Sequence, residues 1–209
     1  MTAPVSPNSL PLVLAITGAS GAVYAVRLLE VLLTGGRQVH LLVSPSGAAV
    51  IKQELNLEVD VARFGLETLL AKDLAERHAD QIRYHHYADF MAPVASGSFL
   101  TGGMVVCPCS GATLSGIAHG ASNNLIQRAA DCHLKERRKL ILVPRETPLS
   151  IVQLDNMRRA AEAGAVILPA MPGWYHGVKS LQDLVDFVVA RILDQLAVPH
   201  DLMRRWGED

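Results

Sequence analysis

Short apolar runs alternate along the chain with longer segments that repeat apolar residues at helical spacing. The short runs end in glycine, serine, cysteine or proline, a pattern typical of buried strands in a parallel sheet. Strands are predicted in this way at residues 10–17, 39–43, 104–107, 140–143 and 165–168, and residues 81–87 are predicted as a strand or an extended link.

Helical periodicity predicts helices at residues 23–33, 48–55, 64–77, 110–118, 123–135, 150–163 and 181–196. Strands that alternate with helices predict an α/β fold, a doubly wound parallel sheet with helices on both faces in three layers. We expect one domain over residues 1–209, with a flexible N-terminus at 1–9 and a C-terminal tail at 197–209 that docks on its own subunit or a neighbouring one.

Composition adds an expectation about assembly. Half of the 209 residues are hydrophobic, aromatic residues make up only 5%, and the formal net charge is -1. Apolar content of this kind predicts an oligomer that buries part of its surface between subunits. The charge argues against a nucleic-acid partner, because a phosphate backbone requires a basic face.

The chain also predicts a cytoplasmic location. No apolar run approaches the roughly 18 residues needed to span a membrane, and the first residues lack the pattern of a signal peptide. Cys107, Cys109 and Cys132 are odd in number and lack the spacing of a disulfide framework, which suits a reducing compartment.

Small residues, hydroxyls and charged side chains follow the predicted strands. They are Gly18-Ala19-Ser20-Gly21, Ser44, Ser110-Gly111-Ala112-Thr113, Arg145-Glu146 and Gly173-Trp174-Tyr175. The carboxyl ends of parallel strands meet at one edge of a sheet, and helix N-termini there bind anions through backbone N–H groups. The pattern predicts a site for a phosphorylated ligand.

The details of these turns favour a mononucleotide. The first turn, Gly18 to Gly21, is G-x-x-G rather than the G-x-G-x-x-G of dinucleotide folds. Ser44 stands where such folds place an acidic residue for the ribose. FMN fits this set best, with its phosphate among the hydroxyls.

Charged residues supply the candidate chemistry. Arg145 and Glu146 lie on a short loop between Pro144 and Pro148, where they indicate an anion to hold and a proton to move. The alternative interpretation of that loop is an exposed ion pair. Arg128 and Lys135 are seven residues apart, so they share a helix face. The histidines show no metal spacing, and we predict no metal.

Several motifs occur along the chain in a characteristic order. They are residues 17–22 (TGASGA), 91–93 (MAP), 96–98 (SGS), 107–110 (CPCS), 123–126 (NNLI), 128–131 (RAAD), 135–138 (KERR), 143–148 (VPRETP), 172–176 (PGWYH) and 205–207 (RWG). With these motifs the chain resembles the UbiX-type flavin prenyltransferases, once labelled aromatic acid decarboxylases, over about residues 12–207. The resemblance implies a flavodoxin-like (Rossmann-like) fold and a homododecamer with active sites at subunit junctions.

The reaction implied by the resemblance joins a dimethylallyl group from dimethylallyl phosphate to N5 and C6 of reduced FMN. The product, prenylated FMN, serves UbiD-type decarboxylases, which act in ubiquinone biosynthesis and in aromatic acid decarboxylation. No metal is needed, so protein cations must stabilise the leaving phosphate while an electron-rich wall faces the allylic cation.

The resemblance also assigns residues. FMN would be held by Gly18, Ala19, Ser20, Ser44, Ser110, Gly111, Ala112, Thr113 and Arg145. The donor would be bound by Tyr175 and Arg191, with Ser96, Arg128 and Lys135 nearby and with Glu54 and Trp206 lining the prenyl site. Glu146 would handle protons around the flavin N5 and the departing phosphate, with Ser20 as its relay partner and with Glu54 and Lys135 as further catalytic residues.

The chain departs from the family pattern at two positions. Phe90 stands where close relatives often have tryptophan, which weakens any cation–π contribution and leaves rate or donor preference open. Gln127 stands where a relative has glutamate, beside the retained Arg128.

Two other functions stay open at this point. An FMN-dependent cysteine decarboxylase shares a similar fold, but it uses a histidine near the first helix, and residues 22–33 contain none. A non-catalytic flavin carrier would not require Glu146, Lys135 and Arg191 to converge on a second anion.

Overall fold

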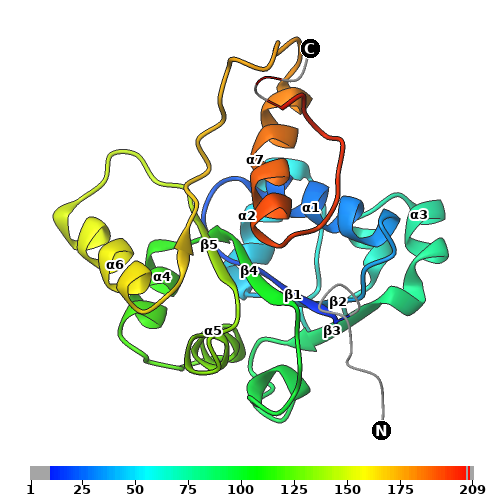
Figure 1. Ribbon diagram of the computed structural model, residues 1–209. Helices are drawn as coiled ribbons and strands as arrows, with labels where there is room; N and C mark the ends of the chain where they lie inside the picture. Colours follow the sequence, from blue (N-terminus) through cyan, green and yellow to red (C-terminus); the bar gives the residue numbers. More distant parts are fainter. Residues whose placement is uncertain (1–9, 206, 208–209) are drawn as a thin grey trace, which may run out of the picture.

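The computed structural model describes residues 10–205 and 207, and its strands form one parallel sheet of six (Figure 1). The spatial order is β3-β2-β1-β4-β5-β6. The strands are β1 (Leu12–Ile16), β2 (Val39–Val43), β3 (Ile82–His86), β4 (Gly103–Cys109), β5 (Leu140–Pro144) and β6 (Val166–Ile167). The order reverses between β1 and β4, which is the switch point where ligands bind in such sheets. The predicted doubly wound α/β fold is confirmed.

Helices cover both faces of the sheet (Figure 1). One face carries α1 (Ala22–Thr34), α2 (Pro45–Leu55) and α7 (Leu181–Gln195). The other carries α4 (Gly111–Ala118), α5 (Leu125–Lys135) and α6 (Ile151–Glu162). The short helix α3 (Lys72–Arg77) and the 3-10 turns η2 (Leu66–Thr68), η3 (Ala79–Gln81) and η4 (Pro93–Ala95) lie in the connections. Within the described residues no helix is both long and apolar enough to pass through a membrane.

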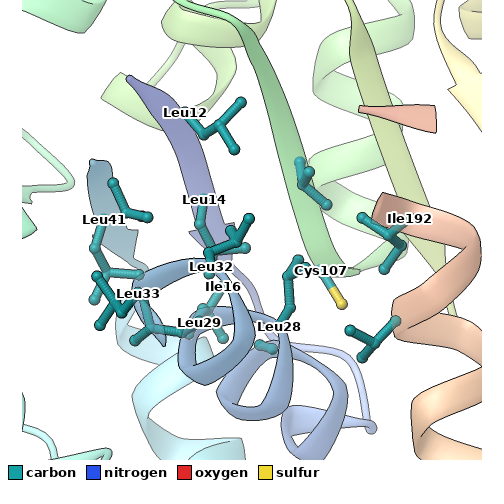
Figure 2. Close-up of a cluster of buried hydrophobic side chains, with 14 of the residues drawn as sticks. Leu12, Leu14, Ile16, Leu28, Leu29, Leu32, Leu33, Leu41, Cys107 and Ile192 are labelled. Atoms are coloured by element: carbon teal, nitrogen blue, oxygen red, sulfur yellow. The ribbon is translucent and has the colours of Figure 1, made fainter. Parts of the chain in front are cut away.

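Alternate residues of the central strands form two hydrophobic cores. Leu12, Leu14 and Ile16 of β1 face α1 and α7, whereas Val13 and Ala15 face the opposite layer. Figure 2 shows the first core, in which Leu28, Leu29, Leu32 and Leu33 of α1 pack against the sheet and Ile192 of α7. Because both sides of the central strands β1 and β5 are buried, these strands are continuous apolar runs in the sequence.

Two element predictions need correction, and one open alternative is decided. Residues 64–77 do not form one helix, because the extended backbone of Ala71 separates η2 from α3. Leu66, Leu69 and Leu70 are buried next to this break. Their burial indicates that tertiary packing outweighs the local preference for a continuous helix. The helix predicted from residue 48 begins at Pro45, a favourable first helical position. The segment 81–87 is a strand, β3, at the edge of the sheet.

Candidate functional site

A buried threonine joins the two loops at the switch point. The Thr17 hydroxyl donates to the Pro108 carbonyl at 2.7 Å and accepts from the Ser110 backbone N–H at 2.8 Å. The Thr17 backbone N–H also donates to the Pro108 carbonyl, at 3.2 Å. The turn after β1 and the turn after β4 are therefore fixed relative to each other, although their residues lie 91 apart in the sequence.

Hydroxyl groups cap the helices that begin at this edge. Ser44 caps α2 by accepting the Gly47 N–H at 3.0 Å, and Ser110 caps α4 by accepting the Thr113 N–H at 3.3 Å. The hydroxyls of Ser44 and Ser46 lie 3.1 Å apart. The N-termini of α2 and α4, with the hydroxyls of Ser44, Ser46, Ser110 and Thr113, are suited to bind a phosphate, and we call this group the cradle.

Gly18 allows the first turn to approach α2. A β-carbon at Gly18 would lie 2.6 Å from the Ser46 β-carbon, which is closer than two carbon atoms can pack. The glycine of the first turn thus lets the backbone after β1 lie directly against the hydroxyls at the start of α2. The G-x-x-G turn therefore serves close packing at the cradle.

Glu54 occupies the N-terminus of α1. Its carboxylate accepts the backbone N–H groups of Gly21 at 2.9 Å and Ala22 at 2.8 Å, and the Ser20 hydroxyl also donates to it. Burial alone would raise the pKa of Glu54, but these hydrogen bonds and the charge of Arg145 outweigh burial and lower it. An ionised side chain thus already satisfies the positive end of this helix, which leaves the starts of α2 and α4 for a phosphate.

Arg145 and Glu146 follow β5 and point to different partners. Arg145 Nε donates to the Ser20 carbonyl at 3.3 Å, so this cation lies against the first turn. The Glu146 carboxylate accepts the Thr147 N–H at 3.2 Å and borders a hollow of about 40 Å³ that Met157 and Pro169 also line. This geometry differs from the simple ion pair considered above. It also pairs the Ser20 hydroxyl with Glu54, whereas the family resemblance implies that Ser20 is the relay partner of Glu146.

A second group of predicted site residues lies around α5. Arg128 Nε donates to the Ala95 carbonyl at 3.1 Å, which ties the helix to the loop that contains Ser96. A β-carbon on Gly97 would lie 2.6 Å from Lys135 Nζ, so the same loop also contacts the end of α5. Ser96, Arg128 and Lys135 are therefore neighbours.

A third group lies on α7 and on the loop before it. The Tyr175 ring meets Phe187 edge-on at a centroid distance of 5.8 Å, and Arg191 follows Phe187 by one helical turn. Phe187 and Arg191 border a hollow of about 380 Å³ against β6. Trp206 lies outside the described residues.

The residues around the cradle and the group around α5 lie at opposite ends of β5. Lys135 ends α5 before the strand, whereas Arg145 follows the strand directly. Five residues of extended chain span roughly 17 Å. Within one chain, Glu54, Arg145 and Glu146 therefore lie with the cradle at one end of β5. Lys135 lies at the other end of this strand.

Sequence reasoning missed Thr17 and Ser46 as members of this edge. Thr17 was assigned to the end of a strand, yet a hydroxyl at a strand end was the signal that identified Ser44 and Ser110. Ser46 belongs to the first turn of α2, and its role becomes visible only when Gly18 packs against it.

Comparison with known proteins identifies the family of the chain. A family model described as Flavoprotein matches residues 2–193, so the class of protein that the fold and cradle define is a flavoprotein. The flavin prenyltransferase UbiX of Pseudomonas aeruginosa is 51% identical over 195 residues, which are 93% of this chain and 93% of that protein. The chain belongs to the UbiX flavin prenyltransferase family.

Solved structures of relatives share the whole fold. AnUbiX (PadA1), crystallised with FMN and dimethylallyl pyrophosphate, is 38% identical with a TM-score of 0.82 and covers 95% of this chain and 98% of its own. The dodecameric FMN-dependent UbiX-like decarboxylase of Escherichia coli O157:H7 is also 38% identical, with a TM-score of 0.80, and covers 95% of this chain and 100% of its own.

The cysteine decarboxylases resemble this chain in fold alone. The peptidyl-cysteine decarboxylase EpiD is 14% identical with a TM-score of 0.53. At that identity the comparison supports a common architecture and no common chemistry.

Proposed function

We propose that the protein is a flavin prenyltransferase that joins a dimethylallyl group from dimethylallyl phosphate to N5 and C6 of reduced FMN. The observation that carries this proposal is the cradle at the switch point, where Thr17 ties the turn after β1 to the start of α4 and Arg145 lies against the same turn. Membership of the family supports the reaction, and the relative crystallised with FMN and dimethylallyl pyrophosphate supports FMN and a phosphorylated dimethylallyl donor as substrates.

The cradle fits FMN by its chemistry. Ser44, Ser46 and Thr113 offer hydroxyls to the phosphate, and the backbone of Gly18, Ala19, Ser20, Gly111 and Ala112 borders the same edge. Arg145, held against the first turn, would face the flavin ring system. When bound, reduced FMN supplies the electron-rich ring that accepts the prenyl group.

The remaining residues would stabilise charge and move protons. Arg128, Lys135 and Arg191 would balance the phosphate that leaves the donor, which replaces the metal ion that prenyl transfer commonly uses. Glu146, whose carboxylate contacts only its own loop among the described residues, would accept and return protons near the flavin. Glu54 and Ser20 would form a fixed wall beside the prenyl group.

The complete site is proposed to form between subunits. Because Lys135 and Arg145 lie at opposite ends of β5, both can line one site only when they come from different chains. The dodecameric relative supports an assembly of this kind, and we propose a homododecamer. Large apolar side chains that are exposed in the single chain, such as Ile151, Val152 and Trp174, suit such contacts.

The proposal extends to the setting of the reaction. Cys107, Cys109 and Cys132 are free, buried thiols, which suits the reducing cytoplasm. A UbiD-type decarboxylase would receive the prenylated FMN.

Mass spectrometry of the flavin tests the proposal directly. Reduced FMN, the protein and dimethylallyl phosphate are incubated without air, and a parallel sample receives dimethylallyl diphosphate. We expect a flavin heavier by one C5H8 unit from the monophosphate. Unchanged FMN with both donors would refute the function, and product from the diphosphate alone would correct the donor.

A further inference from the structure

Asp194 connects the last turn of α7 to the segment that follows the helix. One carboxylate oxygen accepts from Arg191 at 2.8 Å. The other accepts from His200 at 3.1 Å and from Arg205 at 2.9 Å. A single carboxylate thus holds three side chains, two of them beyond the end of the helix.

The end of α7 makes this connection possible. Ala197 adopts a left-handed backbone with φ 53°, its N–H donates to the Asp194 carbonyl at 3.1 Å, and the Val198 N–H donates to the Leu193 carbonyl at 3.0 Å. These two bonds define a Schellman ending, which reverses the chain. The segment after it runs back alongside α7 (Figure 1).

Burial strengthens the arrangement around Asp194. Its side chain is 18% exposed and that of His200 is 2% exposed, whereas that of Arg191 is 47% exposed. Burial alone would raise the pKa of Asp194, but the hydrogen bonds from Arg205 and His200 outweigh burial and lower it, so the group is ionised at neutral pH. Of the three partners, His200 is therefore buried, whereas Arg191 and Arg205 are both partly exposed to solvent.

We propose that Asp194 is a positioning residue for the donor phosphate, because it orients Arg191 and fixes the tail at the same time. An arginine carries five N–H donors in a rigid plane, so the hydrogen bond to Asp194 leaves donors for a phosphate. Holding the long side chain in one orientation lowers the entropy lost on binding. This inference rests on the proposed function, since it takes Arg191 as a donor ligand.

The substitution Asp194→Asn tests the inference in the full-length protein. It keeps the shape of the side chain and removes its charge. We expect the KM for dimethylallyl phosphate to rise about tenfold while kcat changes less than about threefold and FMN retention stays unchanged. Trypsin should also cleave faster after Arg204 and Arg205, because the tail loses its anchor; mass spectrometry measures the rate. Asp201→Asn, an exposed carboxylate of the same segment, is the matched control and should match the wild type in both assays.

The outcomes separate this inference from the proposed function. An unchanged KM and unchanged tail cleavage in Asp194→Asn would overturn it. A parallel fall of kcat, FMN retention and melting temperature would also overturn it, because that pattern describes a general structural role. Arg191→Gln is the second variant: if it raises the KM and Asp194→Asn does not, only the positioning role fails. If Arg191→Gln leaves the KM unchanged, the donor site of the proposed function fails.

Discussion

Glu54 and Glu146 differ in the number of hydrogen bonds that their carboxylates accept, and this difference suggests different roles for them. Glu54 accepts hydrogen bonds from two backbone N–H groups and a serine hydroxyl, so it is fixed and ionised. Among the described residues, the Glu146 carboxylate accepts a hydrogen bond only from the backbone N–H of Thr147. A carboxylate with so few donors can exchange protons with a substrate, whereas one held by three donors serves as a fixed charge.

We expect Glu146→Gln to retain FMN and to bind the donor, but to lose at least about 100-fold in kcat, because an amide cannot carry protons. Single-turnover rates and the flavin content of the purified variant measure these effects. Glu76→Gln, an exposed glutamate of α3, is the control and should turn over normally. A Glu146→Gln rate equal to that of the wild type would remove this residue from the mechanism.

Two buried histidines predict acid sensitivity. His40 stacks on His85, and His133 pairs with the Thr101 hydroxyl at 2.7 Å. Burial is the main cause that lowers the pKa of both His40 and His133 to about 4. Their unfolded pKa is about 6.5, so the unfolded chain binds more protons between these values and stability falls as the pH drops through that window.

The measurement is the free energy of unfolding by urea at pH 7 and pH 5, at one protein concentration. Each of these histidines lowers it by at most about 1.4 kcal/mol per pH unit inside the window. As the pH falls, the free energy of unfolding should begin to decrease at a pH above the range in which carboxylates take up protons. His119→Gln, at an exposed position, should leave the loss intact, whereas equal stability at both pH values would contradict the prediction.

At the scale of elements, the helix that carries Arg191 begins with a capping box. The Ser180 hydroxyl accepts the Asp183 N–H at 3.3 Å, and the Asp183 carboxylate accepts the Ser180 N–H at 2.8 Å. We expect Ser180→Ala to lower the free energy of unfolding by about 1 kcal/mol, because it leaves a helix N–H without its acceptor. Urea denaturation measures the change. Ser180→Asn, which retains a capping acceptor, should stay close to the wild type, and an equal loss in both variants would exclude capping as the cause.

Elements were predictable where local chemistry and packing agree. The central strands follow from their apolar runs, and α7 follows from apolar spacing that begins after Ser180. The ends of α5 and α7 lie within one residue of the predicted ends, although Arg137 and Ala197 take the left-handed conformation that glycine usually supplies.

The candidate site was predictable in its composition and only partly in its geometry. Hydroxyls and small residues at strand ends identified the edge, because parallel strands must deliver their ends together. The contact of Glu54 with Gly21 depends on how α2 packs against α1, which the sequence does not state. The resemblance placed Lys135 and Glu146 in one site, but the chain separates them across β5.

At the scale of the whole molecule, this separation predicts complementation between inactive variants. Lys135→Ala and Glu146→Gln chains, co-expressed in equal amounts, should assemble into mixed oligomers. A site needs an intact Glu146 from one chain and an intact Lys135 from another. Random assortment makes a half times a half, or about a quarter, of the sites complete. Prenylation activity of the mixture measures the recovery.

The control uses two residues that one chain supplies together. Arg145→Ala co-expressed with Glu146→Gln should recover no activity, since each cradle then contains one defect. Recovery in this control, or none with Lys135→Ala, would refute a site shared between subunits. Light scattering on every mixture confirms that assembly is equal.

The carboxylate of Glu54 at the start of α1 also has a consequence for cofactor choice in a cell. Nicotinamide and flavin dinucleotides bind comparable sheets by laying their bridging diphosphate on the N-terminus of the first helix. Here that position holds a negative charge of the protein itself, so a bridging diphosphate would meet repulsion instead of free N–H groups. We therefore expect this carboxylate to disfavour dinucleotides and to leave the edge to a ligand whose single phosphate binds away from the start of α1.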